Sequence, residues 1–405
     1  MTQAKHSVLT LNGGSSSIKF ALYQVGDPPT RGLHGKVDRI GLHGTNFVFN
    51  DPARNQQDRR GIGDMNQRSA ANFLFDWLHN QIDLASIAAV GHRVVNGGAN
   101  FHEPQRVTEE MLDELRRISA YAPEHLNFEI DLIDLIGARV PDLLQVACFD
   151  TAFHREMPRV AKILPIPRRY QAKGVERSGF HGLSYTFLME ELARVAGNEA
   201  AQGRLILCHL GNGASLTAVR GGKSIDTSMG FTPAAGVPMS TRSGDLDPGL
   251  VLYLAQTEQM SAQQFHQMVN HESGLLGVSE TSPDLRDLLD REATDVRAAE
   301  AISLFCYQVK KWIGAFAAAL GGLDTLVFAG GIGENAPAIR ARICDGLGFL
   351  DIRFDEIRNA AGEPVISVDA SRAQVRVIRT DEDVIIAKAV FRILAGIPTI
   401  ERVCQ

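Results

Sequence analysis

Two short runs of alternating hydrophobic and polar positions flank a turn of small residues near the start of the chain. The first run covers residues 8–11 and the second covers residues 18–22, which predicts a strand, a tight turn and a second strand. The same pattern recurs at residues 205–219 around the turn Gly211-Asn212-Gly213. Such turns offer closely spaced backbone N–H groups, and the first adds hydroxyls and the charge of Lys19, which together suit a phosphate group. Two such loops in different halves of the chain indicate an internally duplicated protein with two lobes and a ligand between them.

A third glycine-rich turn, at residues 330–333, follows an apolar run and leads into a helical pattern at residues 336–343. This turn differs from the other two because a helix, not a strand, follows it. Its backbone N–H groups are therefore expected to face a ligand at the start of that helix.

Two other phosphate-binding motifs compete with this interpretation. The spacing Gly331-x-Gly333-x-x-Ala336 fits the dinucleotide-binding fingerprint, and Asp351 follows about 20 residues later, as that motif requires. An NAD enzyme stays open as an alternative, although little chain remains after this turn to build a dinucleotide domain. The tripeptide at residues 222–224 is similar to the end of a Walker A loop, but Thr217 stands where the first glycine of that loop belongs.

Helical periodicity is clear at residues 109–119, 183–196, 298–320 and 383–394, and short apolar runs that predict strands stand between these segments. This alternation predicts the α/β class. A length of 405 residues suits two domains better than one core. The polar stretch at residues 50–67 predicts a surface excursion within the first domain.

Composition restricts the classes of partner. The chain is 44% hydrophobic and 22% charged, with a formal net charge of -6, which argues against nucleic acid or an anionic membrane as the main partner. No apolar run approaches the length of a membrane span. The five cysteines are scattered without CxxC or zinc spacing, so we expect reduced thiols in a cytoplasmic protein.

Five further motifs follow one another in a fixed order: GHRVVNGG at 91–98, FDTAFH at 149–154, SGFHG at 178–182, DTSMGFTP at 226–233 and TRSGDLDP at 241–248. Together with the three glycine-rich turns, they resemble the acetate kinases of the actin/Hsp70/sugar-kinase superfamily, from the first strand to the last helix. The resemblance implies two hinged lobes of similar design with mixed sheets flanked by helices, and it implies a homodimer. Residues 1–154 would form the N-terminal lobe with the acid site, and residues 155–385 would form the nucleotide-binding C-terminal lobe. A final helix near residues 386–405 would pack back on the first lobe.

Phosphoryl transfer requires a cradle for the donor phosphates, a divalent metal and cations over the transferring group. The resemblance implies that Arg93 holds the substrate carboxylate, while His181 and Arg242 stabilise the transition state. An ionised carboxylate needs no general base, whereas a sugar hydroxyl would need one. Asp150 follows an apolar run that predicts a strand, so it could be that base or could orient the water shell of the metal. The resemblance favours the second role.

The remaining ligand contacts also come from the resemblance. It implies that Mg²⁺ or Mn²⁺ is held near Asn12 and Glu382, although an acidic residue at a helix start is also a favourable N-terminal charge. ATP as the phosphoryl donor would contact Lys19, His209, Leu210, Gly211, Asn212, Gly213, Asp284, Leu285, Arg286, Gly331, Ile332, Gly333, Glu334 and Asn335. Without the resemblance, the segment at 284–286 would be a solvated helix start.

The acyl pocket is where the chain departs from the family pattern. In acetate kinases this pocket is apolar, and the matching positions here are Val95, Glu124, Phe180 and Pro233. The resemblance also implies that His125 contacts the acid. An ionised Glu124 beside a methyl group would be poorly solvated and would repel the substrate carboxylate. Either the loop turns Glu124 towards water or a partner subunit, or the substrate is not acetate. The sequence predicts phosphorylation of acetate by ATP, with propionate or another short acid as the alternative and a sugar kinase as a more remote one.

Overall fold

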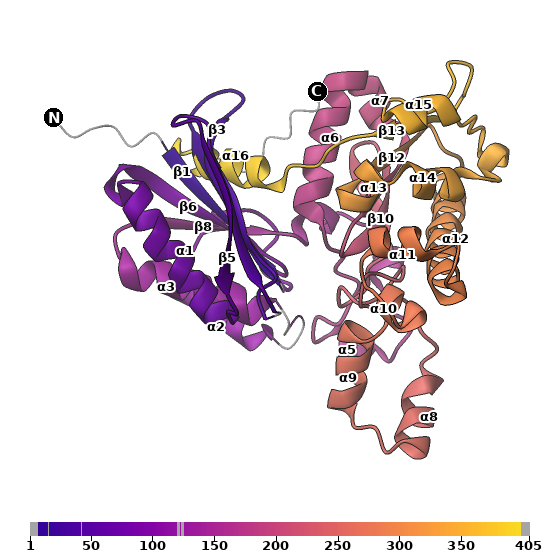
Figure 1. Ribbon diagram of the computed structural model, residues 1–405, viewed down its shortest axis with the longest axis horizontal. Coiled ribbons are helices and arrows are strands. Elements are labelled where there is room, and N and C mark those ends of the chain that lie inside the picture. Colours follow the sequence, from indigo (N-terminus) through magenta and orange to yellow (C-terminus); the bar gives the residue numbers. More distant parts are fainter. Residues whose placement is uncertain (1–6, 15, 42, 120–121, 123–124, 398–405) are drawn as a thin grey trace. The chain divides into compact units, whose positions relative to one another are not determined.

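The computed structural model describes residues 7–14, 16–41, 43–119, 122 and 125–397, and the chain divides into two compact units (Figure 1). Glu124 lies outside the described residues. The first unit contains the chain up to Ala152 and returns at Asp381, and the second runs from Phe153 to Thr380. The two domain boundaries, after Ala152 and after Thr380, lie a few residues before the expected boundaries at 154 and 385.

The first unit is built on a sheet of eight strands in the order β5-β4-β3-β2-β1-β6-β8-β7. Strands β1 to β5 pair antiparallel, β1, β6 and β8 are parallel, and β7 is antiparallel to β8. Because the carboxyl ends of parallel strands meet at one edge of a sheet, the segments that follow β1, β6 and β8 lie close together. The strands are β1 (Ser7–Gly13), β2 (Ser17–Gln24), β3 (Thr30–Asp38), β4 (Thr45–Asp51), β5 (Gln56–Gly63), β6 (Ile87–Val94), β7 (Gln105–Arg106) and β8 (Leu144–Phe149).

Helices cover this sheet. Helices α1 (Gln67–Gln81) and α3 (Leu126–Arg139) contribute buried residues to its main hydrophobic core, and α2 (Glu109–Arg117) packs against α3. The C-terminal helix α16 (Glu382–Leu394) packs against β1, β2 and β6. A Cβ atom at Gly91 of β6 would collide with Ile386 and Val390 of α16, so the glycine allows the close approach. The last helix thus belongs to the first unit, with bounds of 382–394.

The polar stretch at 50–67 is not an irregular excursion. It contains the end of β4, the edge strand β5 and the start of α1, with Asn66 as the N-cap that accepts from the backbone N–H of Ser69. β5 has a single large apolar residue, Ile62, and most of its side chains are exposed. An exposed edge strand lacks the hydrophobic alternation from which strands are predicted, which explains why the sequence pattern missed it.

The second unit has a sheet of five strands in the order β11-β10-β9-β12-β13. β9 is antiparallel to β10 and parallel to β12, as β1 is antiparallel to β2 and parallel to β6. The first two glycine-rich turns therefore occupy equivalent places in the two sheets, as the duplicated pattern predicted. The strands are β9 (Arg204–Leu210), β10 (Ala214–Arg220), β11 (Lys223–Thr227), β12 (Thr325–Ala329) and β13 (Gln374–Val377).

Helix α6 packs against β9 through Tyr185, Leu188 and Leu192, while the long helix α12 packs against β9 and β10. Gly221 and Gly222, both at positive φ, form the hairpin turn between β10 and β11, and Lys223 and Ser224 begin β11, so residues 222–224 are not part of a Walker A loop. Among the described residues, no helix is long and apolar enough to cross a membrane. The helices are α4 (Arg159–Lys162), α5 (Arg168–Gln171), α6 (Gly182–Ala196), α7 (Asn198–Gln202), α8 (Gly249–Thr257), α9 (Ala262–His271), α10 (Gly274–Ser279), α11 (Leu285–Arg291), α12 (Val296–Leu320), α13 (Gly330–Asn335), α14 (Pro337–Cys344) and α15 (Glu356–Ala361).

Candidate active site

The parallel strands of the first unit bring an arginine and a carboxylate together at one edge of the sheet. Arg93 stands near the end of β6, and Asp150 directly follows β8. Arg93 donates from Nε and Nη2 to Oδ2 of Asp150, at 3.0 and 2.5 Å, and from Nη1 to the backbone oxygen of Gly13, at 3.2 Å. Burial lowers the pKa of Arg93, but the neighbouring carboxylate of Asp150 acts in the opposite direction, and the pKa is raised above its ordinary value. Arg93 is thus a fixed cation in a site largely shielded from water, which suits the binding of an anion.

Glu129 of α3 completes this cluster, and it was not among the predicted site residues. Its Oε1 lies 3.5 Å from Nη1 of Arg93, and its Oε2 accepts from the backbone N–H of Val95 at 2.7 Å. A signal was present in the sequence, because Glu129 falls at helical spacing between Leu126 and Ile133 on the buried face of α3. An acidic residue on the apolar face of a helix indicates a buried partner or a ligand.

The predicted acid-pocket residues fall in both units. Val95 is buried beside Arg93 in the first unit, where His125 forms the N-cap of α3. Phe180 and Pro233 belong to the second unit; Phe180 is buried, and the carbonyl oxygen of Pro233 accepts from Arg242 at 3.2 Å.

Asn12 and Glu382, the predicted metal ligands, are hydrogen-bonded to each other. Nδ2 of Asn12 donates to Oε2 of Glu382 at 2.9 Å, although the two residues are far apart in the sequence. Because its amide nitrogen is engaged, Asn12 offers its amide oxygen to a cation. The part of the chain that the structure describes contains no group of three or more His, Cys, Asp or Glu residues able to hold a metal. One carboxylate and one amide oxygen fit Mg²⁺, which takes most of its ligands from water and substrate phosphates.

In the second unit, His181 lies against the glycine loop between β9 and β10. Its backbone is left-handed, with φ 59°, and it forms the N-cap of α6; such a conformation is uncommon outside glycine and is concentrated at functional sites. Nδ1 of His181 shares a hydrogen bond with Oγ of Ser215 at 2.8 Å, and Tyr185 contacts the same hydroxyl. A Cβ atom placed on Gly213 would lie 3.2 Å from Nε2 of His181. The ring therefore presents Nε2 to the loop.

His209 and Arg242 join His181 at this loop. The rings of His181 and His209 stack with their centroids 4.3 Å apart, and Nδ1 of His209 shares a hydrogen bond with Ser184 at 2.8 Å. Nη1 of Arg242 would lie 3.6 Å from a Cβ atom on Gly213. Two imidazoles and a guanidinium thus surround a turn of backbone amides, which is a suitable arrangement for a phosphoryl group.

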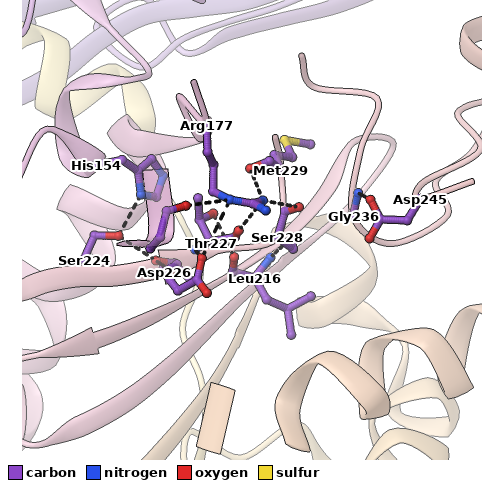
Figure 2. A network of polar contacts seen from close by, with 12 residues as sticks. His154, Arg177, Leu216, Ser224, Asp226, Thr227, Ser228, Met229, Gly236 and Asp245 are labelled. Carbon is purple, nitrogen blue, oxygen red and sulfur yellow. Dashed lines mark hydrogen bonds and ion pairs between the residues drawn. The ribbon is translucent and has the colours of Figure 1, made fainter. Parts of the chain in front are cut away.

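A network of polar contacts links His154 and Arg177 to residues 224–229 of the second unit (Figure 2). Arg177 donates from Nη1 to the consecutive carbonyl oxygens of Thr227, Ser228 and Met229, at 3.0, 3.3 and 3.1 Å. The buried His154 shares hydrogen bonds with Ser224 through Nδ1 and with the carbonyl of Phe180 through Nε2. Neither Arg177 nor His154 was among the predicted site residues, although both lie within or beside the recognised motifs.

The third glycine turn is itself the helix α13, so its N–H groups are not all directed to a ligand. The side chain of Glu334 accepts from the backbone N–H groups of Gly330 and Thr380, at 2.9 and 3.0 Å. A Cβ atom on Gly211 would lie 3.6 Å from the backbone nitrogen of Gly331. The structure therefore brings the second and third glycine turns side by side, and Glu334 has a structural role within them.

The other predicted nucleotide residues have local roles in the structure. Asp284 is the N-cap of α11, its carboxylate accepts from the backbone N–H and the guanidinium of Arg286, and Leu285 is buried. The side chain of Arg286 holds the pKa of Asp284 below its ordinary value. Lys19 is exposed on β2, where it pairs in register with Asn12. A contact of these residues with ATP stays a prediction.

The model of the acetokinase family matches residues 7–388. The chain belongs to the acetokinase family. It is 42% identical to a propionate kinase of Citrobacter rodentium (strain ICC168) over 96% of this chain and 97% of that protein. It is also 42% identical to an acetate kinase of Rhodopseudomonas palustris (strain TIE-1), over 96% of this chain and 98% of that protein. Membership of this family confirms the resemblance that the ordered motifs carried.

Solved structures agree with this assignment to the acetokinase family. The acetate kinase of Porphyromonas gingivalis superposes with a TM-score of 0.85 at 35% identity, covering 96% of this chain and 100% of that chain. A propionate kinase from Francisella tularensis gives a TM-score of 0.87 at 34% identity, covering 95% and 98%. The predicted α/β class with mixed sheets flanked by helices is confirmed, and the NAD-enzyme alternative is wrong.

Proposed function

We propose that this chain transfers the γ-phosphoryl group of ATP to the carboxylate of a short-chain acid, giving an acyl phosphate and ADP, and that the reaction runs in both directions. The observation that carries this proposal is the fixed cation Arg93 at the edge of a parallel sheet, held by Asp150 in a site shielded from water. Because little water reaches Arg93, its charge-assisted hydrogen bonds to a bound carboxylate would be stronger than they are in water.

The residues divide the chemistry between them. Arg93 orients the acid, whose ionised oxygen attacks phosphorus without a general base. His181 and Arg242 lie against Gly213, and they stabilise the charge that spreads over the transferring oxygens. Asp150 accepts two hydrogen bonds from Arg93 and holds its guanidinium in place. These roles of individual residues are part of the proposal and go beyond membership of the family.

We assign the divalent cation to Mg²⁺, with Mn²⁺ as a substitute. Asn12 and Glu382 would hold it, since their side chains already contact each other and offer the hard oxygen ligands that it prefers. Bound there, the cation would neutralise negative charge on the phosphates.

Acetate is the proposed substrate, and propionate is the second candidate because relatives with both names match this chain at the same identity, 42%. Val95 of the first unit and Phe180 of the second are each buried and apolar; the resemblance assigns both to the acid site, which supports a short alkyl chain over a polar one. A sugar substrate finds no support in the described pocket residues.

We also propose that the protein is a homodimer. Helix α8 (Gly249–Thr257) carries no charged residue and has no buried residue of its own. Val251, Leu252 and Tyr253 are 46%, 62% and 60% exposed, and burying such side chains contributes about 1.5–3 kcal/mol each. Light scattering should give the mass of a dimer for the wild type and a shift towards the monomer for Leu252→Lys, but not for the control Ile357→Lys on α15. A dimer that Leu252→Lys leaves intact would exclude α8 as the interface.

The cytoplasm is the proposed compartment. The described cysteines Cys148, Cys208, Cys306 and Cys344 are buried and free, which supports a reducing environment.

Trapping of the acyl phosphate with hydroxylamine tests the proposed function. Purified protein, ATP and Mg²⁺ should form hydroxamate with acetate, and a series of acids of increasing length should rank acetate against propionate. Formation of ADP without hydroxamate from any short acid would overturn the proposal.

A further inference from the structure

Glu129 is a buried carboxyl group beside the proposed acid site, and the proposed mechanism gives it no role. It is 1% exposed on α3, where the neighbouring residues Leu126, Phe128 and Ile130 are also buried. Burying a carboxyl group among apolar side chains is costly unless it has a partner. Its Oε2 has one, the backbone N–H of Val95 at 2.7 Å.

The charges around Arg93 do not require an ionised Glu129. Asp150 alone accepts two hydrogen bonds from Arg93, and these two residues balance each other as one cation and one anion. An ionised Glu129 would leave one excess negative charge among three side chains that are at most 11% exposed. An uncompensated charge in a site shielded from water is strongly destabilising. The neutral acid is therefore the favoured form of Glu129.

The pKa of Glu129 agrees with this charge count. Burial raises the pKa to about 8, and the negative charge of Asp150 adds to this, while Arg93 and the N–H of Val95 act in the opposite direction. On the same helix, the backbone N–H of Glu129 donates to the carbonyl oxygen of His125 at 3.0 Å. At neutral pH the side chain is therefore mostly protonated.

In neutral Glu129, the proton belongs on Oε1. Oε2 accepts from the N–H of Val95, which leaves Oε1 to carry the hydrogen. Oε1 is buried and has no hydrogen-bond partner among the described residues. It lies 3.5 Å from Nη1 of Arg93, which is a donor and cannot accept a proton. A buried O–H group without an acceptor is rare and points to a ligand. An oxygen of an acid bound at Arg93 would supply that acceptor.

We propose that Glu129 is a further substrate-binding residue, which as a neutral acid donates a hydrogen bond from Oε1 to the carboxylate held by Arg93. This inference rests on the proposed function. It makes the affinity for the acid depend on pH, because an ionised Glu129 would lose the donor and repel the substrate.

Two substitutions at Glu129 test the proposal in the full-length protein. Glu129→Gln keeps the size and a donor but cannot ionise, whereas Glu129→Met keeps the size and removes the donor. Asp134→Asn is the matched control, an acid-to-amide change on the exposed side of the same helix, where Asp134 accepts from Arg116. All variants are first compared with the wild type in thermal unfolding and in the KM for ATP.

The KM for the acid should distinguish the variants. With half-titration near pH 8, the wild type should show about a tenfold rise in KM between pH 7 and pH 9, and Asp134→Asn should follow it. Glu129→Gln should match the wild type at pH 7 within about threefold and should show no such rise. Glu129→Met should raise KM at pH 7 by about 10- to 100-fold, the loss expected for a hydrogen bond to a charged group.

Several results would overturn the proposal. They are a tenfold or larger fall in KM for Glu129→Gln at pH 7, an unchanged pH dependence in that variant, and a normal KM for Glu129→Met. An infrared difference spectrum between wild type and Glu129→Gln at pH 7 provides a readout independent of activity, because the neutral carboxylic acid has its own carbonyl band. Absence of that band also overturns the proposal. Failure of the wild type to form any acyl phosphate would instead overturn the proposed function.

Discussion

Gly213 offers a way to disturb the proposed phosphoryl site with a single methyl group. Its backbone is not among the glycines at positive φ, so alanine can adopt the same conformation. The added Cβ atom would lie 3.2 and 3.4 Å from Nε2 and Cε1 of His181, and 3.6 Å from Nη1 of Arg242. Gly213→Ala therefore places a methyl group against the two side chains to which we assign stabilisation of the transition state.

We expect Gly213→Ala to have a small effect on stability and a large effect on the rate. Alanine reduces the entropy of the unfolded chain, a gain of about 0.4–1 kcal/mol, and a shift of the His181 ring by a few tenths of an ångström offsets part of it. The free energy of unfolding should thus change by less than about 1 kcal/mol. Removing one well-placed donor from a transition state costs about 10²- to 10³-fold in rate. We expect kcat to fall by about 10²-fold, with KM for the acid within about threefold of the wild type.

Steady-state kinetics and urea unfolding of the same preparation measure both quantities. Gly314→Ala on α12 is the control, because a Cβ atom there meets nothing within 4 Å; it should leave kcat unchanged and raise stability by up to about 1 kcal/mol. If Gly213→Ala retained kcat within threefold, the reaction would not take place against this loop. A large loss of stability would instead identify the contact with His181 as structural.

Contacts within each of the two units support three further predictions. Arg93→Ala and Arg242→Ala should each lower turnover by about 10³-fold, and only Arg93→Ala should also raise the KM for the acid; near-normal turnover would refute these roles. Arg177→Met removes the donor shared by three consecutive carbonyls of buried residues, so urea unfolding should show a loss of about 1–3 kcal/mol, and no loss would mean that water replaces the guanidinium. Because folding raises the pKa of Glu129 from 4.5 to about 8, its contribution to stability is complete below pH 4.5 and is lost as the pH rises through 8. The wild type should therefore lose more stability than Glu129→Gln between pH 7 and pH 9, and equal losses would show that Glu129 does not titrate in this range.

Local patterns predicted much of the fold. Helices expected at 109–119, 183–196 and 298–320 are found at 109–117, 182–196 and 296–320, because each has a wide apolar stripe that packs on a sheet or a neighbouring helix. The two strand–turn–strand patterns are also confirmed. The edge strand β5 was missed because its exposed side chains carry no hydrophobic alternation.

The candidate site was predicted less completely, for a physical reason. Asp150 was expected at the end of a strand, and it follows β8, because an apolar strand ending in a charged residue is visible in sequence. Its contact with Arg93 depends on the order of parallel strands, which periodicity does not reveal. Glu129 and Arg177 act through contacts with residues distant in the chain, so only the folded structure assigns their partners. The acyl pocket around Glu124 stays a prediction.

Direct transfer of the γ-phosphoryl group to a carboxylate oxygen is the central claim, and ³¹P NMR with ¹⁸O-labelled acid tests it most directly. The protein, ATP, Mg²⁺ and acetate labelled at both carboxylate oxygens should give acetyl phosphate with ¹⁸O in the bridge between carbon and phosphorus, at the rate at which ATP is lost. Omitting the acid should stop the loss of ATP. Acetyl phosphate without label in the bridge, or inorganic phosphate as the only new phosphorus compound, would contradict the account.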